Sequence, residues 1–254
     1  MPVRNQPSCS DNAVPLIAAD DARALKATAA VQTGDLETLE ALLAAHRDLA
    51  MARIGDETSS RTLLHAATDW PGNFPNGSAV IALLVDEGAD VNARFQGGHS
   101  ETPLHWAASS NDVAVLDALL DRGADIEAHG AVLGGGSPLA DACGFGNWDA
   151  ARRLLERGAR TRLKDAAALG LMDRVDARLA DSEPVDRDEI TQAFWSACHG
   201  GQRGAAERLL ERGADINWIG WDDQTPLDVA RGGKYEELVG WLLDCDAKSA
   251  GELL

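Results

Sequence analysis

The sequence has few cysteines, and they are not arranged to hold a metal or a redox centre. Only four of its 254 residues are cysteine, and none forms a Cys-x-x-Cys pair, the spacing on which zinc ribbons and thioredoxin-like sites depend. A nucleophile elbow and a cofactor fingerprint are absent as well. We therefore expect no cofactor and no metal, and a chain of this length can bury a sufficient core without either.

The sequence also lacks a long apolar run. The longest, residues 79–85, is far too short to cross a bilayer. The first residues contain no continuous apolar stretch behind a basic end, so they do not read as a secretory signal. We expect residues 1–19 to be an N-terminal extension and the protein to be cytoplasmic.

Basic side chains are scarce. The chain has 23 Lys and Arg against 41 Asp and Glu, which gives a formal net charge of −18. Such a chain repels the phosphate backbone of nucleic acids and the head groups of anionic membranes. We therefore expect neither nucleic acid nor membrane as a partner, whereas a protein or peptide of basic character fits the charge.

Internal repetition is the informative feature that is present. A Leu-Leu-x-x-Gly-Ala motif or a close variant recurs, and its glycines at positions 88, 123, 158 and 213 are separated by 35, 35 and 55 residues. A second motif, Thr-Pro-Leu-His-x-Ala-Ala or a variant of it, alternates with the first. It occupies residues 62–67, 102–108, 137–143 and 225–230.

Each motif has a structural meaning. Thr or Ser followed by Pro is typical of a helix start, because the hydroxyl caps free N–H groups and Pro fits the first helical position. The small residues after it let a second helix approach closely. That second helix has apolar residues at helical spacing, and the Gly after it favours a left-handed helix end. Each unit is therefore predicted to be helix, turn, helix and extended hairpin.

These motifs closely resemble the ankyrin repeat, and the resemblance covers roughly residues 20–247. It implies an all-α repeat fold: an ankyrin-type α-solenoid of about seven helix-turn-helix units with β-hairpin fingers. Two weaker units at residues 161–167 and 192–198 fill the longer gap. We expect one continuous solenoid over 20–247 and a tail at 248–254, since each unit buries its apolar face only against its neighbours.

The sequence departs from the repeat pattern in four places. The first inter-helix turn is enlarged over residues 69–78, and its two aromatic residues indicate an ordered, packed loop. The hairpins at 94–101 and 129–136 are long, the hairpin before residue 161 is nearly deleted, and the last hairpin has an apolar tip. The deleted hairpin would shorten one wall of the solenoid and could leave a pocket there.

The ankyrin resemblance implies that hairpin tips and first-helix ends line a concave groove. Aromatic residues there are expected to anchor a protein or peptide, and polar ones to give selectivity toward a basic partner. The predicted binding residues are Asp69, Trp70, Phe95, His99, Glu101, Ser109, Phe145, His199, Trp218, Trp221 and Asp222. His65 and His105 stand at the repeat's own His position, so we assign them to structure.

A second hypothesis places a small-molecule site, or an acid–base enzyme, in the same groove. A His is a natural proton carrier near neutral pH and a carboxylate can orient it, so Asp69, Asp141 and His199 are the candidate catalytic residues. They come from different units, so this hypothesis requires an enclosed pocket that contains at least two of them. Self-association through the apolar hairpin tips is a third possibility.

Overall fold

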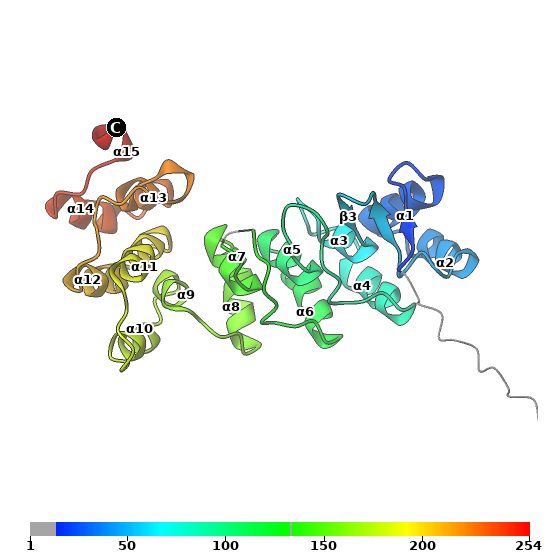
Figure 1. Cartoon of the computed structure of the whole chain (residues 1–254), viewed down its shortest axis with the longest axis horizontal. Helices are drawn as coiled ribbons and strands as arrows, with labels where there is room; N and C mark the ends of the chain where they lie inside the picture. Colours follow the sequence, from blue (N-terminus) through cyan, green and yellow to red (C-terminus); the bar gives the residue numbers. More distant parts are fainter. Residues whose placement is uncertain (1–13, 133) are drawn as a thin grey trace, which may run out of the picture.

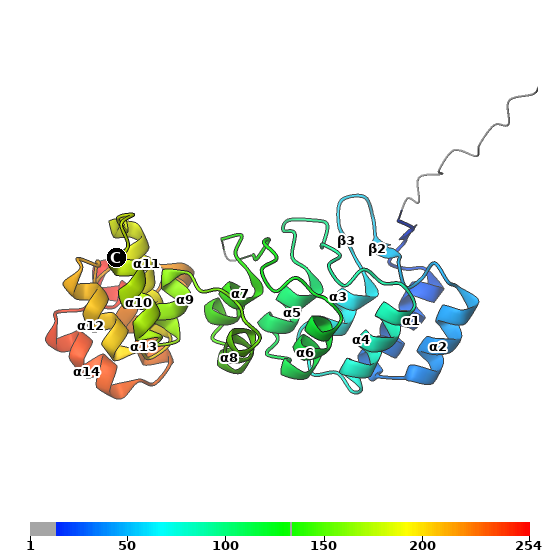
Figure 2. The same cartoon turned by 90° about the horizontal axis from the view of Figure 1, so that it is seen from below.

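The protein is a row of paired helices, seen here in a computed structural model that describes residues 14–132 and 134–254. Most of the predicted N-terminal extension lies outside the described residues. The first helices of the seven pairs are α1 (Ala22–Thr33), α3 (Leu63–Thr68), α5 (Pro103–Ser109), α7 (Pro138–Gly144), α9 (Leu163–Ala168), α11 (Arg187–His199) and α13 (Pro226–Gly232). The second helices are α2 (Leu36–Ala45), α4 (Gly77–Asp86), α6 (Val113–Asp121), α8 (Trp148–Glu156), α10 (Met172–Leu179), α12 (Arg203–Glu211) and α14 (Glu236–Asp244). A 3-10 turn, η1 (Trp221–Asp223), and a last helix, α15 (Ala250–Leu253), complete the described helices. The predicted all-α solenoid is thus confirmed (Figures 1 and 2).

The repeated histidines hold neighbouring units together. The Thr62 amide donates to His65 Nδ1 (3.3 Å), and His65 Nε2 lies 3.2 Å from the Glu101 carbonyl of the next unit. His105 repeats this arrangement with Thr102 and the Gly136 carbonyl. Burial lowers the pKa of His65 to about 3, so the ring is neutral. Because Nδ1 accepts the Thr62 amide, the ring proton lies on Nε2. The assignment of both histidines to structure is confirmed.

Regular strands are confined, among the described residues, to a small sheet near the N-terminus. Strand β2 (Arg53–Gly55) pairs in parallel with β1 (Leu16–Ile17) and antiparallel with β3 (Ser60–Arg61). The next two fingers are closed by isolated backbone hydrogen bonds instead, such as Phe95 N–H to the Glu101 carbonyl (2.7 Å) and Ala131 N–H to the Gly136 carbonyl (3.1 Å). The predicted β-hairpins are therefore mostly irregular loops. Left-handed glycines at 134 and 135 interrupt the second of these.

The apolar core is divided in two. One cluster of buried residues joins the pairs from α1 to α8, and a second joins α9 to α14. Helix α9 packs far more extensively on α11 than on α7, although its Ala168 belongs to the first cluster. Figure 1 shows the group α9–α15 turning away from the row α1–α8. The division falls where the hairpin between α8 and α9 is reduced to a short connection.

No described helix combines the length and the apolar character needed to span a membrane.

Candidate binding groove

The enlarged turn at residues 69–78 helps to form a first hollow of about 470 Å³. Its Trp70 side chain is 81% exposed, whereas the loop beneath it is fixed by an Asn73 N–H donating to Asp112 Oδ2 (2.7 Å). Asp69 accepts a hydrogen bond from Arg61 Nη1 at 2.5 Å. The loop is thus held by hydrogen bonds, and the prediction that its aromatic residues pack was wrong for Trp70, because that side chain points to solvent. The lining residues are Thr68, Asp69, Trp70, Glu101, Trp106, Ser109, Ser110, Val132, Phe145 and Asn147.

Glu101 is the structural centre of the finger beside this hollow. Its side chain is buried and accepts hydrogen bonds from Trp106 Nε1 (2.8 Å) and from the Val132 amide (2.7 Å). His99 Nδ1 lies 3.2 Å from the same carboxylate, and the His99 and Phe95 rings stack with centroids 4.4 Å apart. Phe95 and His99 therefore build the finger and do not line the hollow.

A second, more enclosed pocket of about 210 Å³ lies between the ends of α7, α9 and α11 and the finger that follows α12. Several aromatic rings line it. The His199 ring stacks on Trp195 (centroids 5.2 Å apart), and Trp195 meets Trp221 edge to face at 4.8 Å. Trp195 Nε1 donates to the Gln224 carbonyl (2.9 Å), which holds the apolar finger against α11. Phe145 and Asp222, both predicted binding residues, complete the wall.

Two acid–base groups in this pocket are shifted toward their neutral forms. Burial lowers the pKa of His199, although a hydrogen bond to the Gly144 backbone opposes that effect. Burial also raises the pKa of Asp165, whose Oδ2 accepts the Arg162 amide (2.9 Å). Asp165 occupies the repeat's His position in its unit, so its main part is to fix the start of α9. The lowered pKa makes His199 a weaker base than a free imidazole, whereas the raised pKa favours the protonated form of Asp165.

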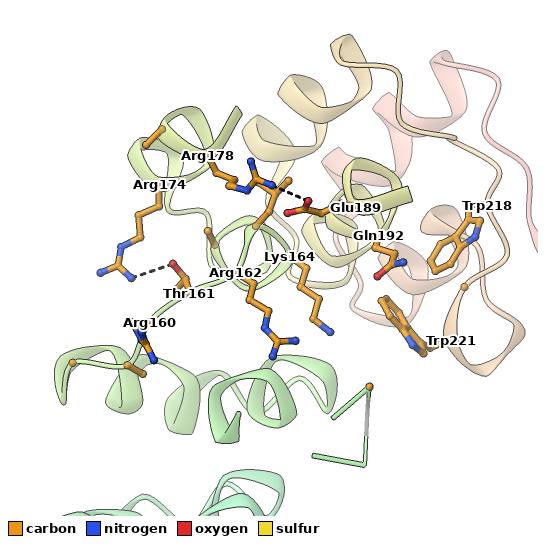
Figure 3. Close-up of a pocket in the computed structure, with 17 residues that line it drawn as sticks. Arg160, Thr161, Arg162, Lys164, Arg174, Arg178, Glu189, Gln192, Trp218 and Trp221 are labelled. Carbon is orange, nitrogen blue, oxygen red and sulfur yellow. Dashed lines mark hydrogen bonds and ion pairs between the residues drawn. The ribbon is translucent and has the colours of Figure 1, made fainter. Parts of the chain in front are cut away.

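The third hollow along these helix ends is an open cleft of about 1180 Å³ at the site of the reduced hairpin. Its walls come from the 158–164 segment, α10, α11 and the finger with Trp218 and Trp221. Figure 3 shows basic side chains on one side and the two indole rings on the other, with Lys164 and Gln192 between them. A pocket at the deleted hairpin was expected from the sequence, but its charge was not.

The charge of this cleft is positive. The side chains Arg160, Arg162, Lys164, Arg174 and Arg178 line it, with Glu189 as the single carboxylate in the lining. Within the described parts of the chain, Arg178 pairs with Glu189 (3.1 Å) and Arg160 with Glu127 (3.3 Å), but Arg162, Lys164 and Arg174 form no ion pair. Lys164 Nζ instead lies 5.4 Å from the centroid of the Trp221 ring. The basic partner expected from the net charge does not match this cleft.

The three hollows adjoin one another. Phe145 lines both the first hollow and the central pocket, while Lys164 and Trp221 line both the central pocket and the basic cleft. The Trp70 turn and the Trp218–Trp221 finger therefore face one groove along the ends of the first helices. Of the eleven predicted binding residues, Phe95 and His99 are outside the lining of these hollows.

The structure does not bring the three candidate catalytic residues together. Asp69 is in the first hollow with Arg61, and Asp141 is completely buried in α7, at the position that Trp106 occupies in α5. Of the three, His199 alone lines the central pocket, so the requirement for two of them in one pocket is not met. Across the described residues, no group of three or more His, Cys, Asp or Glu side chains could hold a metal ion.

The predicted binding residues include neither the basic side chains of the cleft nor Trp195 of the central pocket. One signal was available. Residues 157–164 contain four basic side chains and no acidic one, in a chain of strongly negative charge. Trp195 carried no such signal, because it is a buried residue of α11 whose part in the pocket depends on contacts with other units.

Comparison with known families agrees with this architecture. A family model of ankyrin repeats in three copies matches residues 26–130 and again residues 73–165, which together span more than half of the chain. The chain belongs to the ankyrin repeat family. Ankyrin repeats are generally protein–protein interaction modules. No curated protein matches the chain.

Proposed function

We propose that the protein is an interaction protein that holds a protein or peptide partner along its concave groove. The continuity of the three hollows through Phe145, Lys164 and Trp221 carries this proposal. A groove of this extent suits an extended partner, and its aromatic residues are of the kind that supply most binding energy in interfaces. Phe145 and Trp70 are exposed without any role in the core that would explain them.

The charge of the partner is a finer point. The net charge of −18 favours a basic partner for the surface as a whole. Within the groove, however, Asp69 and Glu101 already have partners inside the protein, so they offer less to a basic ligand than the sequence suggested. Among the described residues, Arg162, Lys164 and Arg174 in the basic cleft form no ion pair, and neither does Asp222 in the central pocket.

The test compares two exposed apolar residues of nearly equal accessibility. Phe145, at the groove, is 49% exposed, and Leu243, on α14, is 48% exposed. Quantitative pull-downs would compare the proteins retained by the wild type with those retained by Phe145→Ala, Trp221→Ala and Leu243→Ala. We expect the two groove variants to lose a common set of partners that Leu243→Ala retains, with unchanged helical circular dichroism. Equal retention by all four proteins would count against the groove.

Small-molecule binding is a second candidate, supported by the enclosed central pocket of about 210 Å³ with its aromatic wall and neutral His199. A thermal-shift screen of metabolites on the wild type and on Ser196→Trp, which would fill the pocket from α11, tests it. A compound that stabilises the wild type alone supports this candidate, and the absence of any such compound opposes it.

A further inference from the structure

We propose that the basic cleft takes an acidic segment of the partner peptide, with an aromatic or large apolar side chain of that segment in the adjoining central pocket. This inference rests on the proposed function, because it names the chemistry of the ligand that the groove holds. It depends on the placement of unpaired cations beside an aromatic wall, next to the short connection between α8 and α9.

The charge of the cleft selects carboxylates. Five cationic side chains face one carboxylate among its lining residues, and Arg178 already neutralises that carboxylate. Arg162 and Arg174 are exposed and form no ion pair among the described residues, so they are available to a ligand. Guanidinium groups bind carboxylates through paired hydrogen bonds, and those charge-assisted bonds are the stronger kind.

The aromatic side of the cleft adds a second requirement. Trp218 and Trp221 meet edge to face with centroids 5.5 Å apart, opposite the basic wall. Lys164 stands above the Trp221 ring, so it is placed at the boundary between the charged wall and the aromatic one. Because Lys164 and Trp221 also line the central pocket, an acidic residue in the cleft and an aromatic residue in the pocket would be close neighbours in the ligand sequence.

The size and the surroundings of the cleft favour a peptide over other anions. About 1180 Å³ in an open cleft exceeds the usual range for small-molecule pockets, which is roughly 300–1,000 Å³. A nucleic acid would extend beyond the cleft over a surface of strong negative net charge, where its phosphates are repelled. A short acidic segment places its few charges inside the cleft and avoids that repulsion.

The experiment selects phage-displayed random peptides on the full chain and measures the affinity of the selected peptides by fluorescence anisotropy. It uses two double variants that remove the same amount of positive charge. Arg162→Gln with Arg174→Gln removes charge from the cleft. Arg152→Gln with Arg203→Gln removes it from the outer helices α8 and α12, where both arginines are exposed.

We expect selected peptides to combine Asp or Glu with a neighbouring aromatic residue. The cleft variant should bind them about tenfold more weakly or worse, as charge removal at an interface does. The outer variant should bind them as the wild type does, and added salt should weaken the wild-type complex more than the complex of the cleft variant.

Three results would overturn the inference: selected peptides without acidic residues, equal weakening by the two double variants, or tighter binding of a labelled single-stranded RNA than of the best peptide. A separate variant, Phe145→Ala, tests the proposed function. If peptides of another composition bind and Phe145→Ala weakens them, the groove stands and the acidic ligand is wrong. If none of these variants affects the selected peptides, both proposals fail.

Discussion

Truncation of Phe194 tests whether the two core clusters unfold separately. Phe194 lies on α11, is completely buried and is the largest fully buried side chain of the chain's described part. Replacement of a buried Phe by Ala costs about 3–5 kcal/mol, because apolar contacts are lost and a cavity remains. At about 1.4 kcal/mol per factor of ten, Phe194→Ala should raise the population of the opened C-terminal half by roughly two to three and a half orders of magnitude.

Native-state hydrogen exchange measures this effect locally. We expect Phe194→Ala to reduce amide protection in α9–α14 while protection in α3–α6 stays nearly constant. Leu116→Ala, at a completely buried position of α6 in the first cluster, is the matched control and should produce the opposite distribution. If either variant reduced protection equally in both halves, the division of the core at α8–α9 would have no energetic meaning and the reasoning would be refuted.

Three further predictions concern single sites. Gly200→Ala should strongly destabilise the protein in urea, because an added Cβ would lie 1.9 Å from the Ala168 carbonyl oxygen. Gly240→Ala, where an added Cβ in α14 meets open space, should be neutral or stabilise the protein by up to about 1 kcal/mol. Equal effects of the two substitutions would contradict this account. Glu101→Ala should lower the free energy of unfolding by about 2 kcal/mol, since the Trp106 indole N–H and the Val132 amide lose their acceptor. The near-ultraviolet circular dichroism of Trp106 should change as well. An unchanged urea midpoint would contradict this prediction. The free energy of unfolding should fall as pH drops from about 6.5 toward 3, because His65 binds a proton in the unfolded state but stays neutral when buried in the folded state. The contribution of that residue is at most about 1.4 kcal/mol per pH unit. His65→Gln should flatten the pH profile of stability, and an identical slope in the variant would count against the assignment.

The regular units could be predicted because their signals are local. A Thr-Pro step caps a helix and a Gly ends one within the same unit, so residues 102–124 define their own helices without reference to distant parts of the chain. The weaker unit around residues 192–198 was found, but its helix begins earlier, at Arg187. Asp186 caps it by accepting the Glu189 amide (2.7 Å), a start that lacks the Thr-Pro motif.

The groove could be predicted only in outline, since its chemistry depends on which side chains find partners after folding. Asp69 and Glu101 line the first hollow, but the sequence could not show that Arg61 and Trp106 engage their carboxylates. Net charge is an average over the chain, and it concealed the basic run at residues 157–164. The reduced hairpin exposes that run, so a departure from the repeat pattern and a local charge anomaly coincide.

Site-specific photo-crosslinking tests the central claim most directly. A photoreactive phenylalanine would be placed at Phe145, where two hollows of the groove meet, and in a second protein at Leu243, which is equally exposed on α14. The account predicts that the partner captured by the wild type crosslinks from position 145 and not from position 243. Crosslinking of that partner from position 243 alone would contradict it.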